Sequence, residues 1–402
     1  MSKPNKRKGY KHTSLGWIPE DWESSELIDF VFKKNGKYDP TIKSESKPCI
    51  ELEHIEKETG QLLGYTDAKE QASIKNIFER GDVLFGKLRP YLQKYWFAQF
   101  EGVCSSEIWV LNGIKTRCTN KFLFYLVQTN RFVQAANVTS GSKMPRADWD
   151  YLSSFPFILP PLPEQKAIAA VLSTWDTAIE TTQKLIEQKE RRKKALMQQL
   201  LSDKKRLKGF DGKWKEVRLG DITKKISRRN KELLDAKVYS VTNTNGFVLQ
   251  SEHFEREIAG EDLSNYKIIK KHEFAYNPAR VNVGSLAYFE NEVGLISSLY
   301  VCFKTNGEVL DYILHLILQL DHTKHRISSF GEGGVRIYLW YELFAKIKVM
   351  VPPLPEQEAI AKVLRVADKE LNLLRSKLDF LKEQKKGLMQ KLLTGQVRVK
   401  AS

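Results

Sequence analysis

The chain has 402 residues, 42% of them hydrophobic and 11% aromatic, which suits two or three folded domains with cores of their own. Its 65 Lys and Arg residues outnumber 49 Asp and Glu residues, and the net charge of +16 favours a polyanionic partner, most often nucleic acid. An acidic protein subunit is the alternative partner. The four cysteines lack zinc or disulfide spacing, and neither a signal-peptide pattern nor a run of about 18 apolar residues occurs, so we expect a cytoplasmic protein with no membrane partner.

Residues 1–158 are predicted to form a first globular domain of mixed α and β structure. Short apolar runs broken by Gly, Asn and Pro, such as DVLFGKLRPY and VCSSEIWVL, predict strands and turns. The segment KFLFYLVQTNRFVQAA has a helical pattern instead. Two loops, in GKLRPYLQK and SGSKMPR, combine cations with turn residues in the way that phosphate contacts require. The residues predicted to bind DNA here are Lys87, Arg89, Tyr91, Lys94, Ser142, Lys143 and Arg146. A solvated turn is the alternative interpretation of each residue taken singly.

Residues 159–203 are predicted to contain a long helix, from about residue 164 to 201. The sequence PPLPEQ from Pro160 marks its start, because proline lacks an N–H and Glu164 would lie near the positive end of the helix dipole. A polyproline ligand is the alternative interpretation of this sequence. Apolar residues then recur at steps of three and four over four heptads, which is typical of a coiled coil. This seam comprises Leu172, Trp175, Ile179, Ile186, Leu196 and Leu200, with Thr182, Lys189 and Lys193 at its polar positions.

Residues 204–350 are predicted to form a second domain of the same kind, diverged from the first. Trp214 and Leu219 follow Trp22 and Leu27 by 192 residues. Strands are expected in HEFAYNPARV and SLYVCF, and a helix in VLDYILHLILQL. Arginine pairs with guanine and asparagine with adenine in the major groove, and a glycine-rich loop precedes the next helix. The residues predicted to bind DNA here are Arg228, Arg229, Asn243, Asn245, Asn277, Arg280 and Arg336.

Residues 351–402 repeat the first long helix, from about residue 356 to 393. PPLPEQEAIAKVL from Pro352 differs at two positions from PPLPEQKAIAAVL from Pro160, 192 residues earlier. Such a repeat indicates an internal duplication. The second seam comprises Leu364, Ala367, Leu371, Leu374, Leu378, Leu381, Lys385, Leu388 and Leu392. Two seams of equal length are expected to pair with each other, and pairing with helices of another protein is the alternative.

Catalytic motifs are scarce in this sequence. It contains neither the glycine-rich nucleotide-binding loop GxxxxGK[ST] nor a GxGxxG turn after a strand. Asn277–Arg280 has the first two residues of an adenine methyltransferase motif but lacks its second proline and its aromatic residue. His322 and His325, three residues apart, could hold a metal, but no carboxylate or cysteine completes the set, which favours a solvated helix end. We therefore predict a chain with no active site and no bound metal or cofactor.

The order of these segments resembles the specificity subunit of type I restriction–modification enzymes over nearly the full length. The likeness includes TSLGWIPEDWESSEL, GSKMPRADWDYLSSFPFILPPLPEQ and the final KGLMQKLLTG. The resemblance implies an α+β fold, in which two target recognition domains of mixed α/β structure are joined by two long antiparallel coiled-coil helices in a pseudo-twofold repeat. Each domain would read half of a bipartite site in double-stranded DNA.

The same resemblance implies partners that carry the chemistry. Two methyltransferase subunits would bring S-adenosylmethionine, and two restriction–translocase subunits would use ATP and Mg. The paired helices would set the spacer between the half-sites. The alternatives are a coiled-coil adaptor that binds acidic proteins and a methyltransferase or nuclease hidden in the diverged domains.

Overall fold

The computed structural model describes residues 8–42, 45–138, 144–202, 205–253, 262–330 and 338–400. The chain divides into two compact units. The first unit comprises residues 1–183 and 377–402, and the second comprises residues 184–376. Each unit thus combines one globular domain with the first part of one long helix and the last part of the other. The predicted segments 1–158, 159–203, 204–350 and 351–402 describe the order along the chain, whereas each compact unit takes residues from both long helices.

The first globular domain is built on two sheets. One has the strand order β10-β9-β12-β4, and the other has the order β5-β8-β11-β6-β7 with β11 parallel to β6. Two-stranded pairs join β1 to β2 and β3 to β13. The strands are β1 Tyr10–Thr13, β2 Gly16–Pro19, β3 Glu23–Glu26, β4 Val31–Lys33, β5 Lys37–Tyr38, β6 Pro48–Ile50, β7 Thr66–Asp67, β8 Lys75–Phe78, β9 Val83–Gly86, β10 Tyr95–Phe97, β11 Gly102–Cys104, β12 Ile108–Gly113 and β13 Pro156–Leu159. The helices are η1 Leu27–Asp29, η2 Leu52–His54, η3 Ala68–Glu70, η4 Pro90–Leu92, α1 Asn120–Leu126, α2 Asn130–Ala136 and α3 Trp149–Ser153.

The segment predicted to be helical, residues 121–136, forms two helices, α1 and α2. Thr129 accepts a hydrogen bond from the backbone N–H of Phe132 and so caps the start of α2. Threonine at this position offers the backbone an alternative to a continuous helix, which explains the break.

The second globular domain repeats this plan with two sheets of four strands each in its described residues. Its sheets have the orders β15-β22-β19-β20 and β17-β16-β21-β18, with β16 parallel to β21, and β14 pairs with β23. The strands are β14 Lys215–Arg218, β15 Thr223–Ile226, β16 Val238–Thr242, β17 Gly246–Leu249, β18 Lys267–Lys270, β19 Phe274–Tyr276, β20 Leu286–Tyr288, β21 Val293–Ile296, β22 Val301–Thr305 and β23 Lys348–Val351. The helices are α5 Leu219–Ile222, α6 Gln250–His253, η5 Val281–Val283, α7 Asp311–Gln319, α8 Asp321–Ser329 and α9 Tyr341–Phe344.

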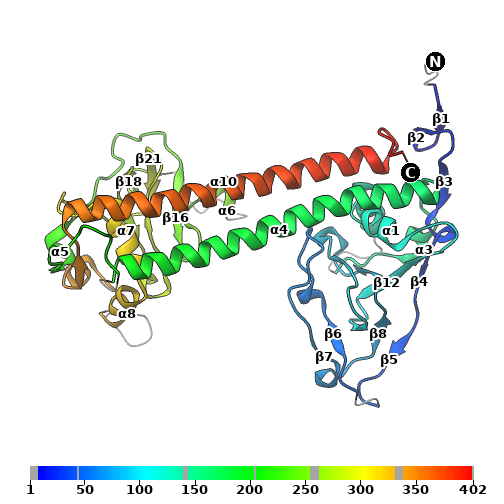
Figure 1. Ribbon diagram of the computed structural model, residues 1–402, viewed down its shortest axis with the longest axis horizontal. Coiled ribbons are helices and arrows are strands. Elements are labelled where there is room, and N and C mark those ends of the chain that lie inside the picture. The colour runs from blue at the N-terminus through cyan, green and yellow to red at the C-terminus, as the bar shows by residue number, and fades with distance from the viewer. Residues whose placement is uncertain are drawn as a thin grey trace. The chain divides into compact units, whose positions relative to one another are not determined.

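The two long helices, α4 Leu162–Leu200 and α10 Leu354–Leu393, lie side by side (Figure 1). Each begins two residues before its predicted start, because a proline in the first turn of a helix leaves no hydrogen bond unmade. Every predicted seam residue is buried or half-buried, as a coiled-coil seam requires. The predicted α+β fold with paired long helices is therefore confirmed.

The polar positions of the seam explain how the helices pair. Ion pairs join Asp176 to Lys385 (2.6 Å) in the first unit, and Lys193 to Asp368, Lys189 to Glu370 (2.5 Å) and Glu190 to Arg375 (2.6 Å) in the second. As the residue number rises along α4 in the second unit, that of its partner on α10 falls overall, so the helices are antiparallel. Tyr125 donates to Asp176 at 2.7 Å, and Tyr312 donates to Asp368. Each globular domain is thereby tied to the helix pair of its own unit.

Candidate nucleic-acid interface

In the first unit, the structure brings two predicted loops together at the end of β9. The backbone N–H of Arg89 donates to Pro145 O, and that of Ala147 donates to Lys87 O, both at 2.8 Å. A β-bridge between Leu88 and Arg146 completes this pairing. Two loops that are far apart in the sequence therefore present their cations from one place.

The side chains at this place differ in their surroundings. Arg89 is exposed and has a left-handed backbone, with φ of 52°. Arg146 forms an ion pair of 3.0 Å with Glu107, and Tyr91 is 50% exposed. Lys94 points elsewhere, since its ammonium donates to Leu52 O at 2.6 Å. Two further residues predicted to bind DNA in this domain, Ser142 and Lys143, lie outside the described residues.

The second unit has the equivalent arrangement at the end of β19. The side chain of Asn277 accepts from the backbone N–H of Ala279 at 3.0 Å, which shapes the turn that exposes Arg280. The segment before α9 pairs with this turn, because the N–H of Leu339 donates to Pro278 O at 3.0 Å. Arg336, also predicted here, lies outside the described residues.

Two aromatic residues that the sequence analysis did not single out flank this second pairing. Tyr338 and Trp340 stack with ring centroids 6.1 Å apart and are 36% and 51% exposed. Exposed aromatic rings can stack on bases or sugars. In the sequence, both residues come shortly after the glycine-rich segment GEGGVR. Alternating aromatic residues at such a place are the sequence pattern from which this part of the site could have been predicted.

Asn243 and Asn245 lie in the exposed turn between β16 and β17, at a cleft of about 1090 Å³ within the second unit. The cleft is lined by two carboxylates, Glu290 and Asp368, and by five cations, namely Lys193, Lys271, Lys324, Arg365 and Arg375. The amide side chains therefore face an electropositive hollow that can attract phosphate groups.

Arg228 and Arg229 have partners within the domain. Arg228 forms an ion pair with the buried carboxylate of Glu273, and Arg229 donates to Asn265 at 2.8 Å. Arg228 is half-buried, and its ion pair joins the end of β15 to the start of β19. Arg229 is exposed.

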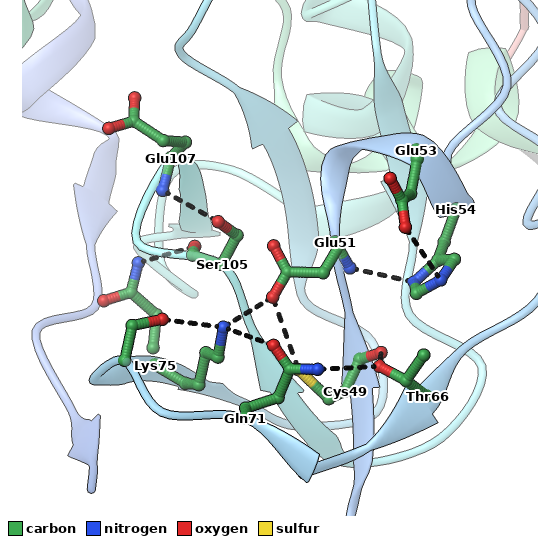
Figure 2. Close-up of polar contacts among 11 residues, drawn as sticks. Cys49, Glu51, Glu53, His54, Thr66, Gln71, Lys75, Ser105 and Glu107 are labelled. Carbon is green, nitrogen blue, oxygen red and sulfur yellow. Dashed lines mark hydrogen bonds and ion pairs between the residues drawn. The ribbon is translucent and has the colours of Figure 1, made fainter. Parts of the chain in front are cut away.

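A separate polar cluster in the first domain has a structural role (Figure 2). The ammonium of Lys75, only 2% exposed, donates to Glu51 at 2.6 Å and to Gln71 at 3.1 Å, and so joins the end of β6 to β8. Cys49 lies beside Glu51, and burial raises the pKa of its thiol to about 11, which keeps it protonated and unreactive at neutral pH. Because these polar groups bond to one another, we assign the cluster a role in stabilising the first domain and no role in binding a ligand.

Within the described parts of the chain, no cluster of three or more His, Cys, Asp or Glu side chains could hold a metal ion. None of the helices found there is long and apolar enough to cross a membrane.

Comparison with known proteins identifies the duplicated unit. A family model described as the type I restriction modification DNA specificity domain matches the chain twice, over residues 19–191 and 211–383. These ranges are offset by 192 residues, as are the two PPLPEQ sequences, so the predicted duplication is confirmed.

Individual relatives agree with this match. The putative type I restriction enzyme MjaX specificity subunit of Methanocaldococcus jannaschii is 28% identical over 98% of each chain. The EcoDI specificity subunit of Escherichia coli is 30% identical over 49% of this chain and 44% of its own. Among solved structures, a chain from a type I R-M system studied for its complex assembly has a TM-score of 0.59 at 18% identity, covering 94% of this chain and 99% of its own. The S subunit from M. genitalium has a TM-score of 0.56 at 17% identity, covering 92% and 96%.

Proposed function

Because this chain belongs to the family of type I restriction–modification specificity subunits, we propose that each of its globular domains reads one half of a bipartite DNA site. The carrying observation is the repeated surface, in which the turn after β9 or β19 pairs with the segment that leads to α3 or α9. The chemistry at these two places differs: Lys87, Arg89 and Arg146 in the first unit, and Asn277, Arg280 and Trp340 in the second. Similar backbones with different side chains suit two readers of different half-sites.

The long helices would supply the spacer and the docking surface. With 39 and 40 residues, α4 and α10 would each extend about 60 Å. The duplication gives the chain two equivalent helix surfaces, which suits two copies of a methyltransferase subunit.

We assign no catalytic step to this chain. In this proposal it acts in the cytoplasm and binds no cofactor. The methyltransferase subunits would bring S-adenosylmethionine, and two restriction–translocase subunits would use ATP and Mg for cleavage and movement along DNA.

The test is a methylation footprint. The chain would be co-expressed with its methyltransferase partner, and modified adenines in random duplex DNA would be mapped at single-base resolution. We expect a split motif with two fixed halves and an unread gap. A continuous motif, or methylation without sequence preference, would contradict the assignment of one half-site to each domain.

A further inference from the structure

The second unit contains a small basic cleft where the first unit is neutral. Its volume is about 470 Å³, and it is lined by Glu216, Arg218, Arg326, Phe330, Lys346 and Lys348. These residues come from β14, from the end of α8 and the residue that follows it, and from the segment that leads into β23 and the start of that strand. Four cations and one carboxylate give the lining a formal charge of +3.

Backbone contacts identify the equivalent residues of the first unit. The N–H of Arg218 donates to Asp221 at 3.1 Å before α5, as the N–H of Glu26 donates to Asp29 at 3.2 Å before η1. The N–H of the next residue then donates to Ile347 O in the second unit and to Phe155 O in the first. Lys346 therefore corresponds to Ser154.

The charged residues that remain also have counterparts, since the register of β14 on β23 matches that of β3 on β13 and places Ser24 at the position of Glu216. Arg326 donates to Lys348 O at 2.5 Å, and Arg131 of α2 donates to Pro156 O at 2.8 Å. The first unit thus retains the buttressing arginine, but replaces Arg218, Lys346 and Lys348 with Glu26, Ser154 and Pro156. The equivalent set in the first unit has a formal charge of zero, so the basic cleft is confined to the second repeat.

The cations of the cleft are available for a ligand. Arg218 and Lys346 are exposed, and no ion pair in the described parts of the chain engages either of them. Lys348 is bound to Glu216 at 2.9 Å, but its side chain is still 55% exposed. Four cations held together with only one carboxylate, Glu216, repel one another, and an anion would relieve that repulsion.

We propose that this cleft binds phosphate groups of the DNA backbone outside the second half-site, an inference that rests on the proposed function. A cleft of this volume accommodates phosphate groups but not a protein helix, which is about 10 Å across. Arginine and lysine are the usual phosphate ligands. The helix α8 supplies Arg326 and also packs against η5. Because η5 begins at the residue after the exposed Arg280, α8 connects the cleft to the surface proposed to read the second half-site. Base contacts would therefore contribute a smaller share of the DNA affinity in the second domain than in the first.

The double variant Arg218→Glu, Lys346→Ser gives the cleft the residues that the first unit already carries, and brings its formal charge to zero. The reciprocal variant, Glu26→Arg with Ser154→Lys, is the matched control. The full chain, alone and with its methyltransferase partner, would be titrated with random-sequence duplex DNA between roughly 50 and 200 mM salt. We expect the cleft variant to bind about tenfold more weakly and to lose about 1 to 2 from the slope of log affinity against log salt. The reciprocal variant should gain affinity, and the methylated motif should be unchanged in both.

The other outcomes overturn the proposal. An unchanged salt slope in the cleft variant would show that no phosphate binds there. An unchanged slope together with loss of the methyltransferase would assign the cleft to an acidic protein surface instead. If the unmodified protein binds no DNA, with or without its partner, the proposed function fails first and this inference fails with it.

Discussion

Arg398, just beyond the end of α10, holds the buried carboxylate of Glu164 in the first turn of α4 through two hydrogen bonds of 2.7 Å. The indole N–H of Trp22 donates to the same carboxylate at 2.8 Å. Its hydrogen bonds to Glu164 and to Asp21 raise the pKa of Arg398 further above its already high value, so the guanidinium stays charged. The end of one long helix is thereby fastened to the start of the other within the first unit.

The second unit repeats this arrangement with residues 192 positions away. Arg206 donates to Glu356 at 2.6 and 2.7 Å, and Trp214 donates to it at 3.0 Å. The glutamate of each PPLPEQ sequence is therefore the shared acceptor of a tryptophan and an arginine. The near identity of the two sequences has a cause inside each unit and does not by itself require a common partner.

Removal of either arginine should destabilise its own unit. Arg398→Ala or Arg206→Ala leaves a buried carboxylate without its cationic partner, which should lower the free energy of unfolding by about 1 to 3 kcal/mol. The two losses should be additive, because the two sites share no residues. Equilibrium urea unfolding measures both. Arg375→Ala is the control, since its pair with Glu190 is exposed and should contribute less than about 1 kcal/mol. Equal effects of all three substitutions would contradict the importance of burial.

The helix pair could be predicted from the sequence because its pattern is local. Proline fixes where each helix begins, and the steps of three and four define the buried face. Two of the ion pairs between the helices are also visible in the sequence, as residues that the duplication has kept. Asp176 and Lys193 recur as Asp368 and Lys385 in the otherwise diverged middle of the helices. These are the residues that pair across the seam.

The globular domains were less predictable because their contacts are not local. The parallel pairing of β11 with β6 joins residues that are distant in the sequence, and no short pattern encodes it. The same limit applies to the candidate site. That Arg89 lies beside Arg146, whereas the ammonium of Lys94 is directed to Leu52 O, depends on how two loops pair.

The ion pair between Lys193 and Asp368 should contribute to helix pairing in the second unit. Asp368→Lys would face Lys193 with a like charge and remove the acceptor of Tyr312, with an expected cost of about 2 to 3 kcal/mol. The exchange Lys193→Asp with Asp368→Lys should recover part of this loss, although Tyr312 still lacks its acceptor. A double-mutant cycle in urea measures the coupling. The same exchange at the more exposed pair of Lys189 and Glu370 should show weaker coupling, and equal coupling would argue against this role.

His315 should make the second unit sensitive to acid. Burial lowers its pKa from 6.5 to about 4, with Lys193 adding to the effect and Asp368 opposing it. The Nδ1 atom is buried without a hydrogen-bond partner, and the ring packs on Tyr288 with centroids 5.2 Å apart. As pH falls from about 6.5 to 4, the unfolded chain takes up a proton that the folded chain does not, so stability falls by up to about 3 kcal/mol.

The variant His315→Gln tests this expectation, because it removes the titrating group. Its free energy of unfolding should change less than that of the unmodified protein between pH 6.5 and 4, as measured by urea unfolding at several pH values. His12→Gln, at an exposed position of the first unit, is the control and should leave the pH profile unchanged. If His315→Gln also leaves the profile unchanged, the acid sensitivity arises from other groups.

Arg89 and Arg280 should act on different halves of the DNA motif. Both are exposed in the turns that follow β9 and β19, one in each unit. If each contacts its own half-site, Arg89→Gln should relax or weaken the first half only, and Arg280→Gln the second half only, by about 1 to 3 kcal/mol of discrimination per base contacted. The methylation footprint of each variant reads out both halves at once, so the unaffected half serves as the internal control. A uniform loss of methylation with an intact motif would make these arginines phosphate contacts, and a change in both halves after either substitution would contradict independent reading by the two domains.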